Sequence, residues 1–310
     1  IKVNKVGICG SDLHMWDAGD QFKGLIMGHE YAGVVVEPGA LKGTLSAGDR
    51  VTSIPLSPCM ECEYCKNGQH NICPANSESP GVHTPGTYAE FFAARPDMVR
   101  TLPDSISDVE ATMVEPAAVT LHAVMQTGIK EGDKVLITGA GIIGSMVTAW
   151  AHYFGASYIA VSEVNKFRAE EIKEFGDVDE VFDGSDPELV PKLMKSSGGG
   201  FDRFIDCSGV APAINTGILT LKKGAVGGLV GLNLNLVPFT LYTTVMKSIR
   251  LQGILGYKLD EFDTALNLIA ERKFNVERFC SQVLPMTDIE KAFESLSAND
   301  TTDLKIILVP

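Results

Sequence analysis

The sequence is poor in basic residues and has no long apolar run. Its 310 residues include 26 lysines and arginines against 39 aspartates and glutamates, which gives a formal net charge of −13. A surface with that average charge repels a nucleic-acid backbone, and no basic cluster offsets the repulsion locally. No stretch approaches the ~20 consecutive apolar residues that a transmembrane helix needs. We therefore expect neither nucleic acid nor a membrane as a partner.

The sequence also lacks an initial methionine and the basic, apolar and small-residue regions of a secretory signal. Residues 1–6 already resemble a β-strand, so we expect the chain to begin inside a domain. Seven cysteines are an odd number, and four of them lie close together in the sequence. That pattern favours metal binding in a reducing compartment over a disulfide framework, and it predicts a cytoplasmic protein.

The length predicts two domains, because 310 residues exceed what one hydrophobic core usually supports. The first hundred residues are rich in glycine, proline and short β-type runs, including 31–36 and 88–93. From about Val114, helical stretches alternate with apolar strands, which predicts an α/β fold with a doubly wound parallel sheet. The strands expected there are 134–138, 158–162, 201–207, 225–232 and 249–255. Further helices are expected at 142–154, 167–175, 261–271 and 288–296, and a closing strand at 304–309.

A glycine-rich loop follows the strand 134–138. Gly139, Gly141 and Gly144 form G-x-G-x-x-G between a β-branched strand and an apolar helix, which is the context that dinucleotide binding requires. The helix N-terminus attracts the pyrophosphate. Glu163 lies about 20 residues further on, where a carboxylate binds ribose hydroxyls and repels a 2′-phosphate. The loop therefore predicts NAD as cofactor, against the alternative of a nucleotide-free turn with a solvated Glu163.

Four cysteines, Cys59, Cys62, Cys65 and Cys73, lie in one loop. Their C-x-x-C spacing suits tetrahedral thiolate ligation of a zinc ion, and four protein ligands leave no open position, so such a site is structural. An iron–sulfur cluster is the rival, because Cys73 is followed by proline as in bacterial ferredoxins. The last spacing is too long for that pattern, and the sequence predicts structural zinc.

A second group of candidate ligands is dispersed along the chain. Taken singly, Cys9 suits a buried core residue, His29 a hydrogen-bonded core histidine, and Glu30 or Glu115 a solvated acid. Together, a thiolate, an imidazole and one or two carboxylates form a credible zinc site with one exchangeable position.

These motifs occur in the order found in the zinc-dependent medium-chain dehydrogenases, and the resemblance covers essentially the whole chain. The chain is most similar to the branch with sorbitol, butanediol and threonine dehydrogenases. The resemblance implies a GroES-like catalytic domain, built from both ends of the chain, around a Rossmann domain. The expected boundaries are 1–116 for the N-terminal catalytic part with a zinc lobe at about 57–75, 117–256 for the Rossmann domain, and 257–310 for the return to the catalytic domain.

The resemblance also implies roles for individual residues. Cys9, His29 and Glu30 match the ligands of a catalytic zinc, and Glu115 matches an acid that binds this zinc directly or through its water. Ser11 and His14 match a proton relay. The positions that match cofactor contacts are Gly139, Gly141, Ile143, Gly144, Glu163, Arg168, Gly231, Leu232 and Tyr257.

Two positions differ from the sorbitol dehydrogenases. Met15 stands where those enzymes usually have a tyrosine, and Gly256 stands where they usually have an arginine. Both changes remove polar groups that would bind a polyhydroxylated substrate. The zinc and hydride chemistry is unaffected by them, but sorbitol becomes a poor candidate substrate.

We therefore expect a zinc-dependent oxidoreductase that transfers a hydride between a secondary alcohol, of diol or polyol type, and NAD, giving the ketone. Two zinc ions are expected per chain, one catalytic and one structural. The family's habit implies a homodimer or homotetramer. One alternative is a threonine-dehydrogenase-like oxidation of a β-hydroxy amino acid. The other is a non-enzymatic zinc-binding module, which the acidic residues Glu61 and Glu63 in the cysteine loop disfavour as a nucleic-acid binder.

Overall fold

The computed structural model describes residues 1–310, except for the side chain of Ser77. The chain divides into two compact units. The terminal unit contains Ile1–Ala118 and Tyr257–Pro310, and the central unit contains Val119–Gly256. The helix α4 (Val114–Thr127) begins in one unit and ends in the other. Among the described residues, no helix combines the length and apolar character needed to cross a bilayer.

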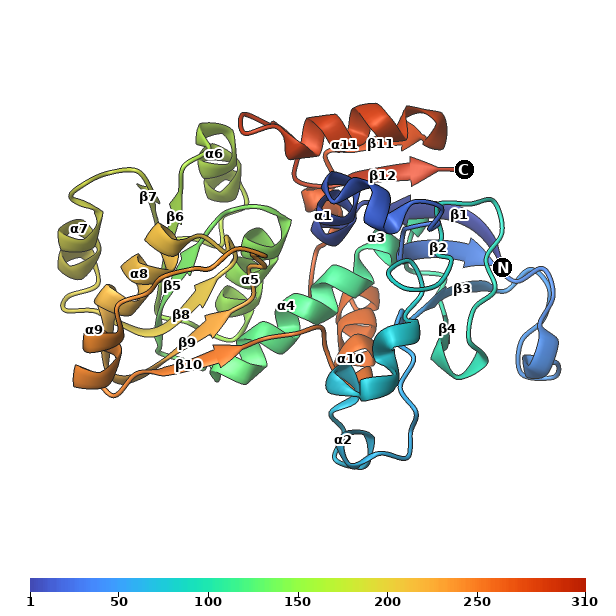
Figure 1. The fold of residues 1–310 in the computed structure, drawn as a ribbon, viewed down its shortest axis with the longest axis horizontal. Coiled ribbons are helices and arrows are strands. Elements are labelled where there is room, and N and C mark those ends of the chain that lie inside the picture. The colour runs from blue at the N-terminus through green and yellow to red at the C-terminus, as the bar shows by residue number, and fades with distance from the viewer. The chain divides into compact units, whose positions relative to one another are not determined.

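The terminal unit is built on a six-stranded sheet in the order β11-β12-β1-β2-β3-β4. Strand β1 pairs antiparallel with both β2 and β12, so the first and last strands of the chain lie side by side (Figure 1). Residues near both ends therefore contribute to one core, in which Val6, Tyr31 and Ile306 are buried. The strands are β1 (Lys2–Gly7), β2 (Glu30–Val34), β3 (Arg50–Ser53), β4 (Val99–Thr101), β11 (Gln282–Pro285) and β12 (Ile306–Val309).

Short helices connect these strands. They are α1 (Gly10–Asp17), α2 (Glu63–Lys66), α3 (Asp108–Thr112), α10 (Leu259–Ala270) and α11 (Ile289–Ser297), with 3₁₀ turns between them. The prediction of a strand at 88–93 is wrong. Only an isolated bridge between Lys2 and Phe91 forms there, because β2 pairs along one edge of β1 and β12 occupies the other from Val6 onward.

The central unit contains the parallel sheet that the sequence predicts, in the order β10-β9-β8-β5-β6-β7. From β5 the chain proceeds outward through β6 to β7 and then returns to β8 on the other side of β5. The reversal makes the carboxyl ends of β5 and β8 the switch point, where such sheets bind ligands. The strands are β5 (Lys134–Thr138), β6 (Tyr158–Glu163), β7 (Glu180–Asp183), β8 (Phe201–Asp206), β9 (Leu221–Leu229) and β10 (Arg250–Gly253).

Helices α5 (Ile142–Tyr153), α6 (Lys166–Glu174), α7 (Leu189–Ser196), α8 (Ala211–Thr220) and α9 (Leu241–Met246) complete the central unit. Its core is apolar: Leu136, Phe204 and Ile218 are fully buried in one cluster. The doubly wound α/β class predicted from the sequence is thus confirmed.

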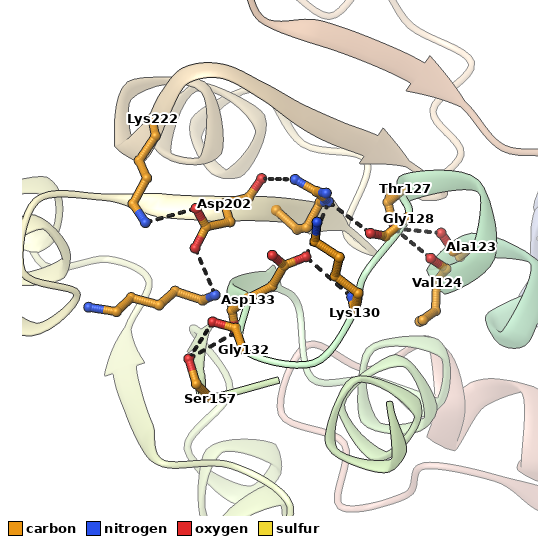
Figure 2. A network of polar contacts seen from close by, with 12 residues as sticks. Ala123, Val124, Thr127, Gly128, Lys130, Gly132, Asp133, Ser157, Asp202 and Lys222 are labelled. Atoms are coloured by element: carbon orange, nitrogen blue, oxygen red, sulfur yellow. Dashed lines mark hydrogen bonds and ion pairs between the residues drawn. The ribbon is translucent and has the colours of Figure 1, made fainter. Parts of the chain in front are cut away.

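A polar network ties the three middle strands of this sheet together at their amino ends (Figure 2). On β8, the Asp202 carboxylate accepts hydrogen bonds from the main-chain nitrogen of Lys134 on β5 (3.0 Å) and from Nζ of Lys222 on β9 (2.8 Å). Partial burial opposes ionisation of this carboxyl, but the bond from Lys222 outweighs it and the pKa of Asp202 is lowered. The network fixes the strand spacing at the end opposite the glycine loop.

Candidate active site and metal centres

The four-cysteine loop brings its sulfur atoms into one cluster. The Sγ atoms of Cys59, Cys62, Cys65 and Cys73 all lie within 4.8 Å of one another. Each of these cysteines is a free thiol. The separation is 3.8 Å between the sulfurs of Cys62 and Cys73 and 3.7 Å between those of Cys73 and Cys59. Four thiols at such distances suit a tetrahedral ion held by sulfur.

The local backbone explains how the loop holds this cluster. Cys62 caps the short helix α2 and accepts a hydrogen bond from the nitrogen of Cys65 at 3.4 Å. The nitrogen of Cys62 in turn donates to the sulfur of Cys59 at 3.3 Å. Backbone donors at Glu61 and Cys62 lower the pKa of Cys59 to about 6, whereas burial raises the pKa of Cys65 to about 12. The donors thus favour thiolate, the form that binds metal.

The second cluster lies in the terminal unit at the junction of β1, α1 and β2. Cys9 is the residue before α1, and Glu30 is the first residue of β2, paired in register with Gly7 of β1. One ligand atom from each of Cys9, His29 and Glu30 lies within 4.8 Å of the other two. The structure therefore brings together three of the predicted catalytic ligands.

Two glycines of the recognised motifs are required by this packing. A Cβ atom on Gly7 would lie 2.4 Å from Oε2 of Glu30. Gly28 has a φ of +88°, and a Cβ there would lie 2.7 Å from the ring of Tyr88. A larger residue at either position would displace a carboxylate or a ring at the centre of the cluster.

Asp12 and Tyr88 support the cluster, and neither was predicted from the sequence. The buried Asp12 carboxylate accepts hydrogen bonds from the nitrogen of Cys9 (2.9 Å) and the hydroxyl of Tyr88 (2.6 Å). Its other oxygen lies 3.8 Å from Nδ1 of His29. At this separation the carboxylate acts on the imidazole through its charge and not through a hydrogen bond. The available sequence signal was an acid in the first turn of a helix that begins directly after Cys9.

Lys305 is a third residue that was not predicted from the sequence. Its Nζ is buried, donates to the carbonyl of Ile8 at 2.7 Å and forms an ion pair with Glu30. Burial alone would lower the pKa of Lys305, but the neighbouring Glu30 and Cys9 raise it. A single lysine in the apolar closing strand was the signal that could have revealed it.

The electrostatics of this cluster favour a cation. Burial opposes protonation of His29, yet Cys9, Asp12 and Glu115 together raise its pKa well above the ordinary value. Burial raises the pKa of Glu115 to about 7. Nδ1 of His29 has no hydrogen-bond partner among the described residues. An excess of buried acids around an imidazole whose Nδ1 lacks a partner fits a divalent metal bound by sulfur, nitrogen and oxygen.

The remaining predicted residues lie at different distances from this centre. Glu115, on the first turn of α4, influences the pKa of His29. Among the described side chains, however, it does not belong to the group whose ligand atoms all lie within 4.8 Å of one another. Ser11 is half-buried and His14 is exposed, both on α1. Tyr257 is buried, and Glu115 together with burial raises its pKa. Its cofactor role stays a prediction.

Met15 lines a pocket of about 420 Å³ in the terminal unit. The apolar residues Trp16, Phe22, Leu25 and Met27 line the same pocket, together with the charged Asp20 and Lys23. The Gly256 that replaces arginine has a φ of +54°, a left-handed conformation that favours glycine.

The glycine loop of the central unit has the geometry of a nucleotide site. Gly139 has a φ of +87°, and a Cβ on Gly144 would lie 1.8 Å from the carbonyl oxygen of Gly139. The Glu163 carboxylate accepts hydrogen bonds from the backbone nitrogens of Ala140, Val164 and Asn165. These donors fix it beside the loop, where it was predicted to meet the ribose.

Arg168 supplies the second sign of a nucleotide site. A Cβ on Gly141 would lie 4.0 Å from its guanidinium, so the side chain approaches the loop. Its buried Nε has no hydrogen-bond partner among the described residues. Ile143 lies in the first turn of α5, and Leu232 is exposed beyond β9. The close-packed glycine loop and the unpartnered Nε of Arg168 fit a dinucleotide.

Comparison with known proteins agrees with this geometry. The family described as "Alcohol dehydrogenase GroES-like domain" matches residues 1–104, and "Zinc-binding dehydrogenase" matches residues 143–271. Probable D-xylulose reductase A of Aspergillus fumigatus is 33% identical over 308 residues, covering 96% of this chain and 86% of the relative. The chain belongs to the zinc-dependent medium-chain dehydrogenases.

Solved structures of dehydrogenases share the whole fold. The 2R,3R-butanediol dehydrogenase of Bacillus subtilis is 28% identical with a TM-score of 0.90, covering 100% of this chain and 91% of that chain. The L-idonate 5-dehydrogenase of Escherichia coli is 26% identical with a TM-score of 0.88, covering 100% and 90%. The family predicted from the motifs is confirmed, and the chain is an oxidoreductase of alcohols with a nicotinamide cofactor. The alternative of a non-enzymatic zinc module is excluded.

Proposed function

We propose that this dehydrogenase oxidises a vicinal diol or another small secondary alcohol to the ketone, with NAD⁺ as acceptor and a catalytic zinc at Cys9, His29 and Glu30. The observation that carries the proposal is the cluster of these three ligands within 4.8 Å, surrounded by buried acids. The named activities of the relatives, on xylulose, butanediol and idonate, support the substrate class.

The residues in and around the cluster have different roles in the proposed reaction. A zinc ion held by Cys9, His29 and Glu30 would supply Lewis acidity to the substrate hydroxyl. Asp12 places a negative charge beside the imidazole of His29, and Lys305 holds the carboxylate of Glu30. Ser11 and the exposed His14 lie on one helix and would carry the hydroxyl proton to solvent.

Glu115 and the glycine loop complete the proposed reaction. With a pKa raised to about 7 by burial, the Glu115 carboxyl can take up or release a proton near neutral pH. The loop from Gly139 to Gly144 would hold the pyrophosphate, and Glu163 the adenosine ribose. The carbinol carbon then loses a hydride to the nicotinamide and its hydroxyl loses a proton, which gives ketone, NADH and H⁺.

We expect butane-2,3-diol to be a better substrate than sorbitol. Neither Met15 nor Gly256 has a side chain that can hydrogen-bond an additional hydroxyl, and each hydroxyl buried without a partner costs about 1–3 kcal/mol. The kcat/KM for sorbitol should therefore be lower by about tenfold or more at saturating NAD⁺. The assay follows NADH absorbance, with L-threonine as a third substrate. A higher value for sorbitol or threonine would contradict the assignment of substrate.

We expect NAD⁺ to be preferred over NADP⁺ because of Glu163. The variant Glu163→Gln removes the negative charge that repels a 2′-phosphate, so kcat/KM for NADP⁺ should rise by about tenfold while that for NAD⁺ falls. Glu170→Gln, an exposed acid on the neighbouring helix α6, is the control and should change neither value. A wild-type enzyme that already prefers NADP⁺ would overturn the role of Glu163.

We also infer that the protein forms a homodimer through the central unit. Eight large apolar side chains between β9 and β10 are exposed, and Leu234 and Leu236 are 91% and 96% exposed. Residues 224–256 contain no acid, although the whole chain carries −13. The negative charge of the chain repels a second copy, but the acid-free segment 224–256 does not contribute to that repulsion. The edge strand β10 can also pair antiparallel with β10 of a second copy. The eight are Leu232, Leu234, Leu236, Phe239, Leu241, Tyr242, Val245 and Met246.

Light scattering after size exclusion tests this interface. The wild type should have a multiple of the 33.2 kDa chain mass, and the double variant Leu234→Glu/Leu236→Glu should be monomeric. Phe91→Glu, at an exposed aromatic residue of the terminal unit, should leave the mass unchanged. A monomeric wild type, or an oligomer that survives both glutamates, would refute the assignment.

A further inference from the structure

We propose that Asp206 is a positioning residue that sets the spacing between the pyrophosphate loop and the strand end that receives the nicotinamide. The inference rests on the proposed use of NAD by the central unit. Asp206 is the last residue of β8, and its side chain is fully buried. It thus lies at the switch point, between the ends of β5 and β9.

The Asp206 carboxylate collects hydrogen bonds from two segments. Oδ1 accepts from the hydroxyl of Thr138 at 2.8 Å, and from the nitrogen and hydroxyl of Ser208 at 3.2 and 2.6 Å. Oδ2 accepts from the nitrogen of Gly209 at 2.9 Å. Thr138 immediately precedes Gly139, the first glycine of the pyrophosphate loop. One carboxylate therefore joins that loop to the turn that follows β8.

The main chain of Asp206 makes the connection to the third strand. Its carbonyl oxygen accepts from the nitrogens of Val230 at 2.9 Å and Gly231 at 3.1 Å. A Cβ on Gly231 would lie 2.1 Å from the nitrogen of Gly209, so the two backbones touch directly. Gly231 and Leu232 are the positions predicted to line the nicotinamide. Displacement of the turn at Ser208 and Gly209 therefore moves that lining as well.

Asp202 provides a natural comparison on the same strand. It joins β5 and β9 through Lys134 and Lys222 at the amino ends of the strands (Figure 2). Asp206 joins the same two strands at their carboxyl ends. A purely structural role would make the two aspartates equivalent for cofactor binding. A positioning role makes only Asp206 matter for the reactive end of the dinucleotide.

The physical consequence concerns the two halves of the cofactor separately. The adenosine and pyrophosphate contacts at Glu163 and the glycine loop do not depend on where β9 ends. Binding of the nicotinamide half requires both the loop and the end of β9 at the correct separation. Loss of the Asp206 carboxylate should therefore weaken the whole dinucleotide more than its ADP-ribose portion.

The experiment compares NADH and ADP-ribose as probes, measured by NADH fluorescence and by calorimetry on the purified full chain. In Asp206→Asn, an amide group replaces one acceptor oxygen and faces hydrogen-bond donors. The Kd for NADH should rise by about tenfold or more, and that for ADP-ribose by less than about threefold. In the matched control Asp202→Asn, both constants should stay within about threefold of the wild type.

Thr138 provides a second test that does not disturb the turn at Ser208. Thr138→Val removes only the bond to β5 and should weaken NADH binding selectively, whereas Thr138→Ser should restore it. This pair keeps the inference testable if Asp206→Asn fails to fold. Equal losses for NADH and ADP-ribose, or equal effects of Asp202 and Asp206, would overturn the positioning role. A wild type that binds neither probe would overturn the proposed cofactor itself.

Discussion

Turnover in Cys9→Ser should fall by about 1,000-fold or more while the protein stays folded. The thiolate is one of three ligands in the buried cluster with His29 and Glu30. Serine is a much weaker zinc ligand, so the variant should retain one zinc ion per chain and lose the Lewis acid that acts on the substrate. A 1,000-fold loss corresponds to about 4 kcal/mol of transition-state stabilisation. Metal analysis and kcat/KM are measured on the same sample.

Cys280→Ser is the matched control for this change. Cys280 is another free thiol of the terminal unit, and its sulfur contacts only the carbonyl of Gln282 among the bonds described for it. This variant should keep both zinc ions and full activity. Mild chelation of the wild type should likewise remove the ion at Cys9 first and stop turnover. Full activity with one zinc ion or fewer per chain would refute the catalytic site.

The variant Cys62→Ser should lose the other zinc ion and much of the stability of the cysteine loop. Zinc binding to such a site is coupled to folding, and zinc-finger peptides gain about 10–16 kcal/mol from it. Even a loss of about 3 kcal/mol lowers the Tm of a unit this size by about 6–12 °C. Thermal unfolding and zinc content measure both effects.

The zinc remaining in Cys62→Ser identifies the site that was lost. If the cysteine loop is structural, the remaining ion is the more easily chelated one, and activity persists below the new Tm. Cys280→Ser again serves as the control for loss of a thiol. An unchanged Tm together with two retained ions would show that the four sulfurs do not form a zinc site.

Features that are continuous in the sequence could be predicted from residue spacing, and the dispersed ligands Cys9, His29 and Glu30 could be predicted from the family resemblance. The residues that support those ligands through tertiary contacts could not be predicted. The glycine loop and the cysteine loop each lie within a short segment, so residue spacing was sufficient. Asp12, Lys305 and Asp206 were missed because their roles depend on tertiary contacts. Lys305 meets Glu30 across 275 positions of the chain. No local pattern distinguishes such a lysine from a surface one.

The strand wrongly expected at 88–93 has the same cause. Its alternating aromatic and small residues suit a β-strand, and its backbone does bond to β1 through Glu90 and Phe92. The limit is set by β12, which comes from the other end of the chain and takes the rest of that edge. The β-propensity of residues 88–93 contains no information about β12, a strand some 200 residues away that pairs with the same edge of β1.

The pairing of β1 with β12 has a consequence for biosynthesis. The central unit is one continuous segment and can fold as soon as it leaves the ribosome, because domains generally fold as units during synthesis. The sheet of the terminal unit cannot be completed until β12 has been synthesised, and Lys305 directly precedes that strand. During translation, Glu30 therefore has no lysine partner until Lys305 emerges. The order of synthesis therefore lets the central unit fold before the metal-binding cluster is complete.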